Sequence, residues 1–309
     1  MSTRTLVIIS LFIASIFWAS AGTVSKLLFP AIDPIPVMML RLGVATVILL
    51  PIFFRKKHPP IKQILIDTLP ISLAAAANFL LFIIGVSKTT ADASTIIYTA
   101  IPILTLLIAK TKIHEAINTQ KLVGVLLGLT GTTIILLLPL LIHKQSLNGS
   151  LTGNLIIFCA LIFWTYYIVG SRQLVIQKHY SSLTIATSII TISFLSMLIL
   201  TIFVPHRSLF PAVLTGIYPL LIIYYGIGVT VVTFMLQQWI IEYSSASTAS
   251  LTNYLQPIFA FMYNAIFLGE RLTPEFLIGS ILVLGGTMLA TGGQTKEFVR
   301  SFIARRRNG

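Results

Sequence analysis

Long apolar stretches separated by short polar segments run through almost the whole chain. Ten of them approach the ~20 mostly apolar residues that a helix needs to cross a bilayer. Lipid offers no partner to an unpaired backbone group, so each stretch is predicted to be a transmembrane helix. The predicted spans are Thr5–Leu28, Ile35–Phe54, Ile64–Val86, Ala93–Lys110, Lys121–Ile142, Leu151–Ser171, Leu183–Val204, Val213–Gln237, Ala246–Leu268 and Glu275–Gly293. No connecting segment is long enough for an additional soluble domain.

Composition supports a membrane protein over a soluble one. Of the 309 residues, 56% are hydrophobic and only 9% are charged, whereas soluble domains carry about 25% charged residues. The mean hydropathy is +0.95. The formal net charge of +13 does not indicate nucleic-acid binding, because the bases lie between apolar stretches instead of forming one basic surface. The predicted partners are a small-molecule substrate and the lipid bilayer, and the oligomeric state is left open.

The bases also predict the orientation of the chain. With the N-terminus inside, fifteen of the 21 bases fall on inner segments and five on outer ones, with Arg41 inside a span. Positive residues favour the cytoplasmic side. We therefore predict cytoplasmic N- and C-termini in the inner (plasma) membrane, and a basic cytoplasmic tail over residues 296–309. The first apolar stretch, with Ala19-Ser20-Ala21, is similar to a cleavable signal peptide, but we expect it to remain as the first span.

An internal duplication relates the two halves. Ile16-Phe17-Trp18 recurs as Ile162-Phe163-Trp164, and a second block recurs at a slightly larger offset, in which Pro102, Glu115, Gly124 and Gly131 correspond to Pro257, Glu270, Gly279 and Gly286. The predicted repeats are residues 1–146 and 147–295. Each repeat holds five spans, an odd number, so the halves must face opposite ways in the membrane. The predicted fold is an all-α integral membrane protein of ten transmembrane helices in two inverted five-helix repeats, an architecture typical of secondary transporters.

Several motifs together resemble the EamA-like branch of the drug/metabolite transporter superfamily, a group of ten-helix permeases. They are Phe17-Trp18 with Gly22 and Lys26, Arg41-Leu42, Ala91-Asp92-Ala93-Ser94 with Pro102, Glu115, Gly124 and Gly131, and their counterparts in Ala246–Ser250, Pro257, Glu270, Gly279 and Gly286. The family often has Gly after the first-span Trp, where this chain has Ala19. The resemblance covers nearly the whole chain and implies export of metabolites or drugs, often amino acids or related compounds.

Polar and aromatic side chains within the spans are candidates for a substrate pathway, because polar groups in lipid are costly and usually face a cavity or another helix. The candidate pathway residues are Trp18, Asn78, Tyr98, Trp164, Gln237, Asn253, Tyr254 and Gln256. For each of them singly, hydrogen bonding between helices is an equally good explanation. As a group, they favour a pathway.

Two prolines are candidate hinges. Pro102 and Pro257 occupy equivalent positions in the fourth and ninth spans, and a proline removes one helical hydrogen bond. A gate hinge is favoured over a static kink because the pair is symmetric. The small residues Gly124, Gly128, Gly279 and Gly286 are interpreted as sites of close helix packing.

Charged residues near the spans are given structural roles at this stage. Arg41 could attract a substrate carboxylate, but we expect it to extend its charge to the membrane surface or to pair with Asp33. Glu115 and Glu270 are expected to fix the following turn or to pair with a base. No acid lies at mid-span, so no carboxylate proton relay is predicted.

The sequence predicts neither an enzyme nor a cofactor. Its five His form no metal-ligand spacing, and no phosphate-binding Walker loop is present. The predicted function is secondary transport by alternating access, with export of amino acids or related compounds. A multidrug or nucleotide-sugar carrier is the alternative within transport, and a membrane-embedded enzyme or a sensor is the alternative outside it.

Overall fold

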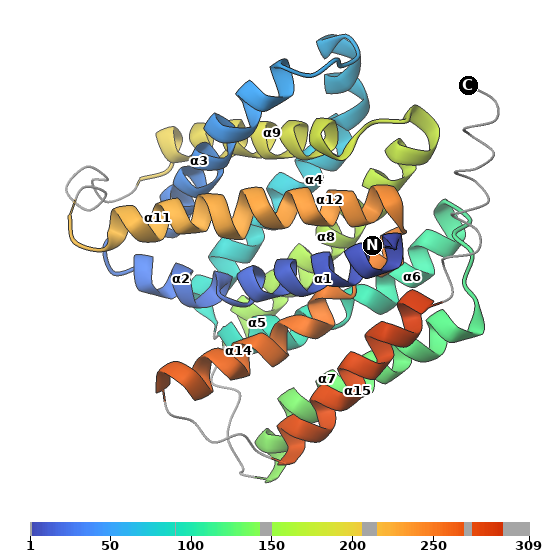
Figure 1. The fold of residues 1–309 in the computed structure, drawn as a ribbon. Coiled ribbons are helices and arrows are strands. Elements are labelled where there is room, and N and C mark those ends of the chain that lie inside the picture. Colours follow the sequence, from blue (N-terminus) through green and yellow to red (C-terminus); the bar gives the residue numbers. More distant parts are fainter. Residues whose placement is uncertain (1, 90, 143–149, 206–214, 269–273, 293–309) are drawn as a thin grey trace, which may run out of the picture.

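The computed structural model describes residues 2–89, 91–142, 150–205, 215–268 and 274–292, and every regular element in those ranges is a helix (Figure 1). The α-helices are α1 (Thr3–Ala19), α2 (Ala21–Leu28), α3 (Pro34–Phe54), α4 (Ile61–Lys88), α5 (Ala91–Tyr98), α6 (Ile101–Lys112), α7 (Thr119–Ile142), α8 (Leu151–Lys178), α9 (Ser182–Phe203), α11 (Tyr218–Gly226), α12 (Thr233–Tyr243), α13 (Ala246–Ala249), α14 (Thr252–Leu268) and α15 (Pro274–Gly292). A π-helix, η1 (Ile227–Val232), joins α11 to α12.

Eight helical segments of the described residues are long and apolar enough to cross a membrane. They coincide with eight of the ten predicted spans. The two others are α7, which is also apolar, and the pair formed by α13 and α14. The protein is therefore an all-α membrane protein, and its helices fit the predicted ten spans.

The packing of the helices follows the internal duplication. The second span (α3) packs on its repeat mate, the seventh (α9), and the fifth (α7) packs on the tenth (α15). Contacts between spans that are not repeat mates also occur in symmetric pairs. The first span packs on the eighth (α1 on α12) as the sixth packs on the third (α8 on α4). Likewise, the first packs on the ninth (α1 on α14) as the sixth packs on the fourth (α8 on α6). A pseudo-twofold axis between the halves produces this pattern.

Glycines bring α7 and α15 together in an antiparallel pair. A Cβ on Gly124 would lie 2.5 Å from the carbonyl oxygen of Gly286, and one on Gly131 would lie 2.5 Å from that of Gly279. The residue number rises along one helix as it falls along the other, so the fifth and tenth spans run in opposite directions, as inverted halves require. The close helix packing predicted at Gly124, Gly279 and Gly286 is confirmed.

Three spans are interrupted by a break in the helix. The first breaks at Ser20, the fourth at residues 99–100, and the ninth at residues 250–251. Pro102 lies in the first turn of α6, directly after the break, where its missing N–H leaves no helical bond unmade. Pro257 instead lies inside α14, beyond the break in its span. The two prolines therefore occupy different local geometries, and their role as hinges stays a prediction.

Candidate functional site

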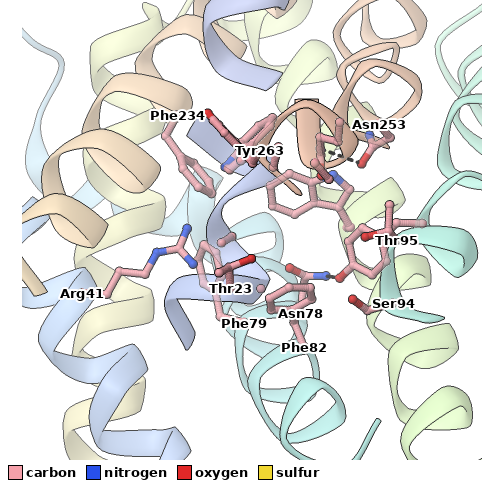
Figure 2. A pocket seen from close by; sticks show the side chains of 18 residues that line it. Thr23, Arg41, Asn78, Phe79, Phe82, Ser94, Thr95, Phe234, Asn253 and Tyr263 are labelled. Carbon is pink, nitrogen blue, oxygen red and sulfur yellow. Dashed lines mark hydrogen bonds between the residues drawn. The ribbon is translucent and has the colours of Figure 1, made fainter. Parts of the chain in front are cut away.

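A cavity lies between the two halves, where the break between α1 and α2 faces α4, α5, α8, α12 and α14 (Figure 2). Its volume is about 130 Å³, close to the roughly 150 Å³ of a cavity that binds a benzene-sized molecule. Its walls are formed by Trp18, Ala19, Ala21, Gly22, Thr23, Arg41, Asn78, Phe79, Phe82, Ser94, Thr95, Tyr98, Trp164, Phe234, Asn253, Gln256, Ala260 and Tyr263.

Six of the eight candidate pathway residues line this cavity, although they come from five different helices. They are Trp18, Asn78, Tyr98, Trp164, Asn253 and Gln256. Gln237 and Tyr254 lie elsewhere. The Gln237 side chain is fully buried and accepts a hydrogen bond from the Tyr167 hydroxyl at 3.2 Å. The Tyr254 ring packs against Gly128 of α7. Helix packing explains these two positions.

An aromatic cluster forms the apolar wall. Trp18 and Trp164, which are repeat mates, meet edge to face with their ring centroids 5.7 Å apart. Phe234 lies edge to face against both, at centroid distances of 5.9 and 5.7 Å. Edge-to-face contacts of this kind add to the stabilisation from burial alone. The cluster therefore gives the cavity a well-ordered apolar wall close to the pseudo-twofold axis.

The polar wall is centred on Asn78 of α4. Its side-chain nitrogen donates to the Tyr98 hydroxyl at 2.7 Å and to the Ala160 carbonyl at 2.8 Å. These two bonds orient the amide so that its oxygen points away from Tyr98 and into the cavity (Figure 2). The site thus offers the Asn78 side-chain oxygen as a hydrogen-bond acceptor. The amide is held in place by Tyr98 of the first half and by the Ala160 carbonyl of the second half.

A second pair of amides comes from α14. The Asn253 side chain donates to the Ser250 carbonyl at 2.9 Å, and the same carbonyl also accepts from the Asn253 backbone N–H at 3.1 Å. Gln256, one turn further on, reaches the side-chain oxygen of Asn253 at 3.5 Å. Residues three apart share one face of a helix, and both of these amides face the cavity.

Arg41 was expected at the membrane surface or paired with Asp33, and that expectation is wrong. Its side chain is buried, with 4% of the residue exposed, and lines the cavity. Nε donates to the Thr230 hydroxyl at 2.6 Å and Nη2 donates to the Val229 carbonyl at 3.0 Å. Both partners lie in η1. The sequence does not reveal this π-helix, which is why the site of Arg41 was missed. The one available signal was a lone base within a predicted span.

The inner end of the bundle, in the predicted orientation, is joined by ionic and polar contacts. Lys121 forms an ion pair with Glu115 at 2.7 Å and donates to the Ser245 hydroxyl at 3.0 Å. The Glu115 carboxylate also accepts from the Ala246 backbone N–H at 3.1 Å and from the Ser247 hydroxyl. Glu115 therefore pairs with a base, as predicted, and links the α6–α7 connection to α13 in the other half. Its repeat mate, Glu270, lies outside the described residues.

A further polar contact at this end involves Tyr180, between α8 and α9. Its hydroxyl donates to the Asp67 carboxylate at 2.6 Å. Burial, together with the nearby carboxylate, raises the pKa of Tyr180 to about 12, so the phenol keeps its proton at neutral pH. The contact joins α4 of the first half to the second half. Within the described residues, no group of three or more His, Cys, Asp or Glu side chains could hold a metal ion.

Two inverted sets of helices around a shared cavity with polar and aromatic walls define a membrane transporter. The sequence profile of the EamA-like transporter family matches the chain twice, over residues 5–137 and 151–292. The chain belongs to the EamA-like transporter family, and each half of the internal duplication corresponds to one copy of the family's repeat.

Several relatives align with this chain over most of their own length. An uncharacterized transporter of Bacillus subtilis, YdfC, is 24% identical, and the alignment covers 94% of this chain and 93% of the relative. A second, YetK, is 28% identical over 90% of this chain and 84% of the relative. An uncharacterized transporter of Archaeoglobus fulgidus is 25% identical over 89% and 82%. One crystal structure superimposes with a TM-score of 0.72 at 16% identity, covering 93% of this chain and 98% of that one. The last comparison shows the shared fold.

Proposed function

We propose that this transporter exports amino acids or related compounds, and that the cavity between the halves is its substrate site. The observation that supports this proposal is that candidate residues from distant parts of the chain meet at one cavity. Trp18, Asn78 and Asn253, taken from three helices and both halves, line one cavity. Helix-to-helix hydrogen bonds alone would not require these side chains to share a space.

The size and chemistry of the cavity favour a small polar metabolite. A volume of about 130 Å³ is close to that of a cavity that binds a benzene-sized molecule, which favours a substrate as small as an amino acid. A nucleotide sugar is several times larger, so the cavity does not favour that alternative. Neutral amides and hydroxyls can orient a zwitterion, while the Trp and Phe rings accommodate an apolar side chain.

The proposed mechanism is alternating access. The pseudo-twofold packing of the halves supports it, because two related halves can exchange roles around a fixed site. With both termini in the cytoplasm of the cell, the Glu115–Lys121 contacts join the halves at the inner end, and α2 and α5 contribute cavity residues on the outer side. This arrangement supports an outward-facing state, in which release to the exterior completes export. The repeats 1–146 and 147–295 are the proposed moving units, in the inner (plasma) membrane.

The double substitution Asn253→Ala, Gln256→Ala tests the site. We expect it to lower saturable counterflow of a labelled amino-acid pool into proteoliposomes at least about tenfold. Two lost hydrogen bonds at about 1 kcal/mol each correspond to a decrease of that size. The matched control is Gln173→Ala, Gln177→Ala, which also removes two amides from one helix but at an exposed position away from the cavity. The control should transport at the wild-type rate.

Three results would contradict the proposal in different ways. Full counterflow by the cavity double variant would place the substrate elsewhere. No accumulation of any amino acid by correctly folded wild-type protein would remove amino acids as the substrate class, and nucleosides, sugars and cationic drugs would be tested in turn. Flux that follows concentration without saturation would indicate a pore instead of a carrier.

A further inference from the structure

Arg41 is the only charged side chain among the described residues that line the cavity. It projects from α3 with its guanidinium directed at the cavity, across from Asn78 (Figure 2). The carboxylates that form ion pairs within the described residues, Glu115 and Asp67, pair with lysines outside the cavity. Counted over the residues that the structure describes, the wall of the cavity therefore carries a net charge of one positive unit.

The partners of Arg41 are all uncharged. The Thr230 hydroxyl and the Val229 carbonyl accept from two of the five N–H groups of the guanidinium, and the neutral Tyr225 side chain is a further polar neighbour. Its central carbon lies 4.3 Å from the centroid of the Tyr225 ring and 5.7 Å from that of Phe79. Aromatic faces attract a cation, but they do not neutralise its charge. They also cannot accept hydrogen bonds from N–H groups that point outward in the plane of the guanidinium.

The π-helix holds the guanidinium in a fixed position. The Thr230 hydroxyl of η1 donates to the Tyr225 carbonyl at the end of α11, at 3.0 Å, while accepting from Arg41. Gly226 allows the eighth span to approach α3 closely, because a Cβ there would lie 2.5 Å from the Val44 side chain and 3.2 Å from the Arg41 carbonyl oxygen. π-helical turns occur frequently at functional sites. Here the turn supplies both acceptors and the close contact that orient Arg41.

A buried cation without a counter-ion is costly, and inside a membrane protein it is rare. Neutral acceptors and ring faces offset only part of the cost of removing the guanidinium from water. An anion that enters the cavity from outside the chain would complete the compensation. The planar fork of arginine matches a carboxylate through two parallel hydrogen bonds.

We propose that Arg41 binds the carboxylate of the transported substrate, so that the transporter selects monoanionic or zwitterionic carboxylates over their neutral or cationic derivatives. One positive charge balances one carboxylate, whereas a phosphate monoester carries about 1.5 to 2 negative charges at neutral pH and would need a second cation. The inference deepens the proposed function and rests on it for the location of the site. It also predicts that cationic drugs are excluded.

The test compares acids with their amides. Thermal unfolding of the purified full-length protein in detergent is followed in the presence of a pool of the twenty L-amino acids, and separately with a pool of the corresponding L-amino-acid amides. We expect the acids to raise the melting temperature at concentrations about 10- to 100-fold lower than the amides, the factor expected when a charge-assisted hydrogen bond is lost. Arg41→Gln should remove this difference and Arg41→Lys should keep part of it. Arg55→Gln, which removes an exposed base at the end of the same helix, should behave like the wild type.

Equal stabilisation of the wild type by both pools, or stabilisation by neither, would overturn the inference. So would a folded Arg41→Gln variant that still prefers acids, or a wild type that a pool of phosphate monoesters stabilises at lower concentration than the acids. The wild-type comparison decides the question even where Arg41→Gln does not fold. The same two pools in counterflow separate the two proposals. No accumulation of any compound counts against the proposed function, whereas equal accumulation of acids and amides counts against the role of Arg41 alone.

Discussion

Glu115→Ala should lower the free energy of unfolding by about 3–5 kcal/mol, the usual cost of removing one partner of a buried ion pair. The Lys121 side chain is 3% exposed and that of Glu115 is 9% exposed. Removing the carboxylate leaves the ammonium buried and facing the Ser245 hydroxyl alone. It also takes away the acceptor for the Ala246 N–H at the start of α13. Denaturant or thermal unfolding in detergent measures the loss.

A double substitution separates the cost of the unpaired charge from the cost of the lost contacts. Glu115→Ala combined with Lys121→Met should recover a large part of the stability, because no charge then remains buried. Lys62→Met, at an exposed position in α4, is the matched control and should unfold like the wild type. A double variant as unstable as Glu115→Ala alone would indicate that the carboxylate acts through α13 and not through Lys121.

Gly124→Ala should destabilise the protein by about 1–3 kcal/mol, the range for inserting a methyl group into a close-packed interface. The added Cβ would lie 2.5 Å from two backbone atoms of α15, the nitrogen of Ala290 and the carbonyl oxygen of Gly286. Neither atom belongs to a flexible side chain, so the helices themselves must separate. The same substitution in an unpacked helix is favourable by roughly 1 kcal/mol, and the expected effect therefore has the opposite sign to helix propensity.

Gly285→Ala provides the matched control on the partner helix. A Cβ at Gly285 meets nothing within 4 Å, so the substitution should leave stability unchanged or raise it. Unfolding of the two variants under identical detergent conditions measures the contrast. Similar stabilities for both would mean that α7 and α15 do not require direct backbone contact, and would remove the structural explanation for the glycine pairs shared by the two repeats.

The candidate pathway residues show which features of the site sequence patterns predict and which they do not. The candidates Asn78, Tyr98 and Asn253, chosen as polar residues within spans, line one cavity, and their role in transport stays a prediction. Tyr254 was grouped with Asn253, but one step along a helix turns the side chain by about 100°, and it faces Gly128 instead. Gln237 differs for a similar reason, since it bonds to Tyr167 within the packed interior. Hydropathy locates a span, but it does not resolve which face of a polar cluster meets the cavity.

Arg41 shows a second limit. The sequence shows that an arginine lies within the second span. The hydrogen-bond partners of this arginine, however, come from η1, nearly two hundred residues further along the chain. The residues of Ile227–Val232 are apolar, glycine and threonine, a composition that ordinary helices in membranes share. The π-helical turn depends on the close approach of α3 to Gly226 and on the hydrogen bonds of Thr230. Contacts between elements, and not local preference, therefore determined the environment of the charge.

By itself the sequence determined that this protein lies in a membrane, that its chain crosses it in about ten helices, and that two related halves face opposite ways. Those properties depend on the length and polarity of single segments and on their number, which are local and countable. The tertiary structure alone decided where the spans break, which six candidates share the cavity, and that Arg41 carries its charge into it. These features depend on distances between segments far apart in the chain, which are set by how the two halves pack around their pseudo-twofold axis.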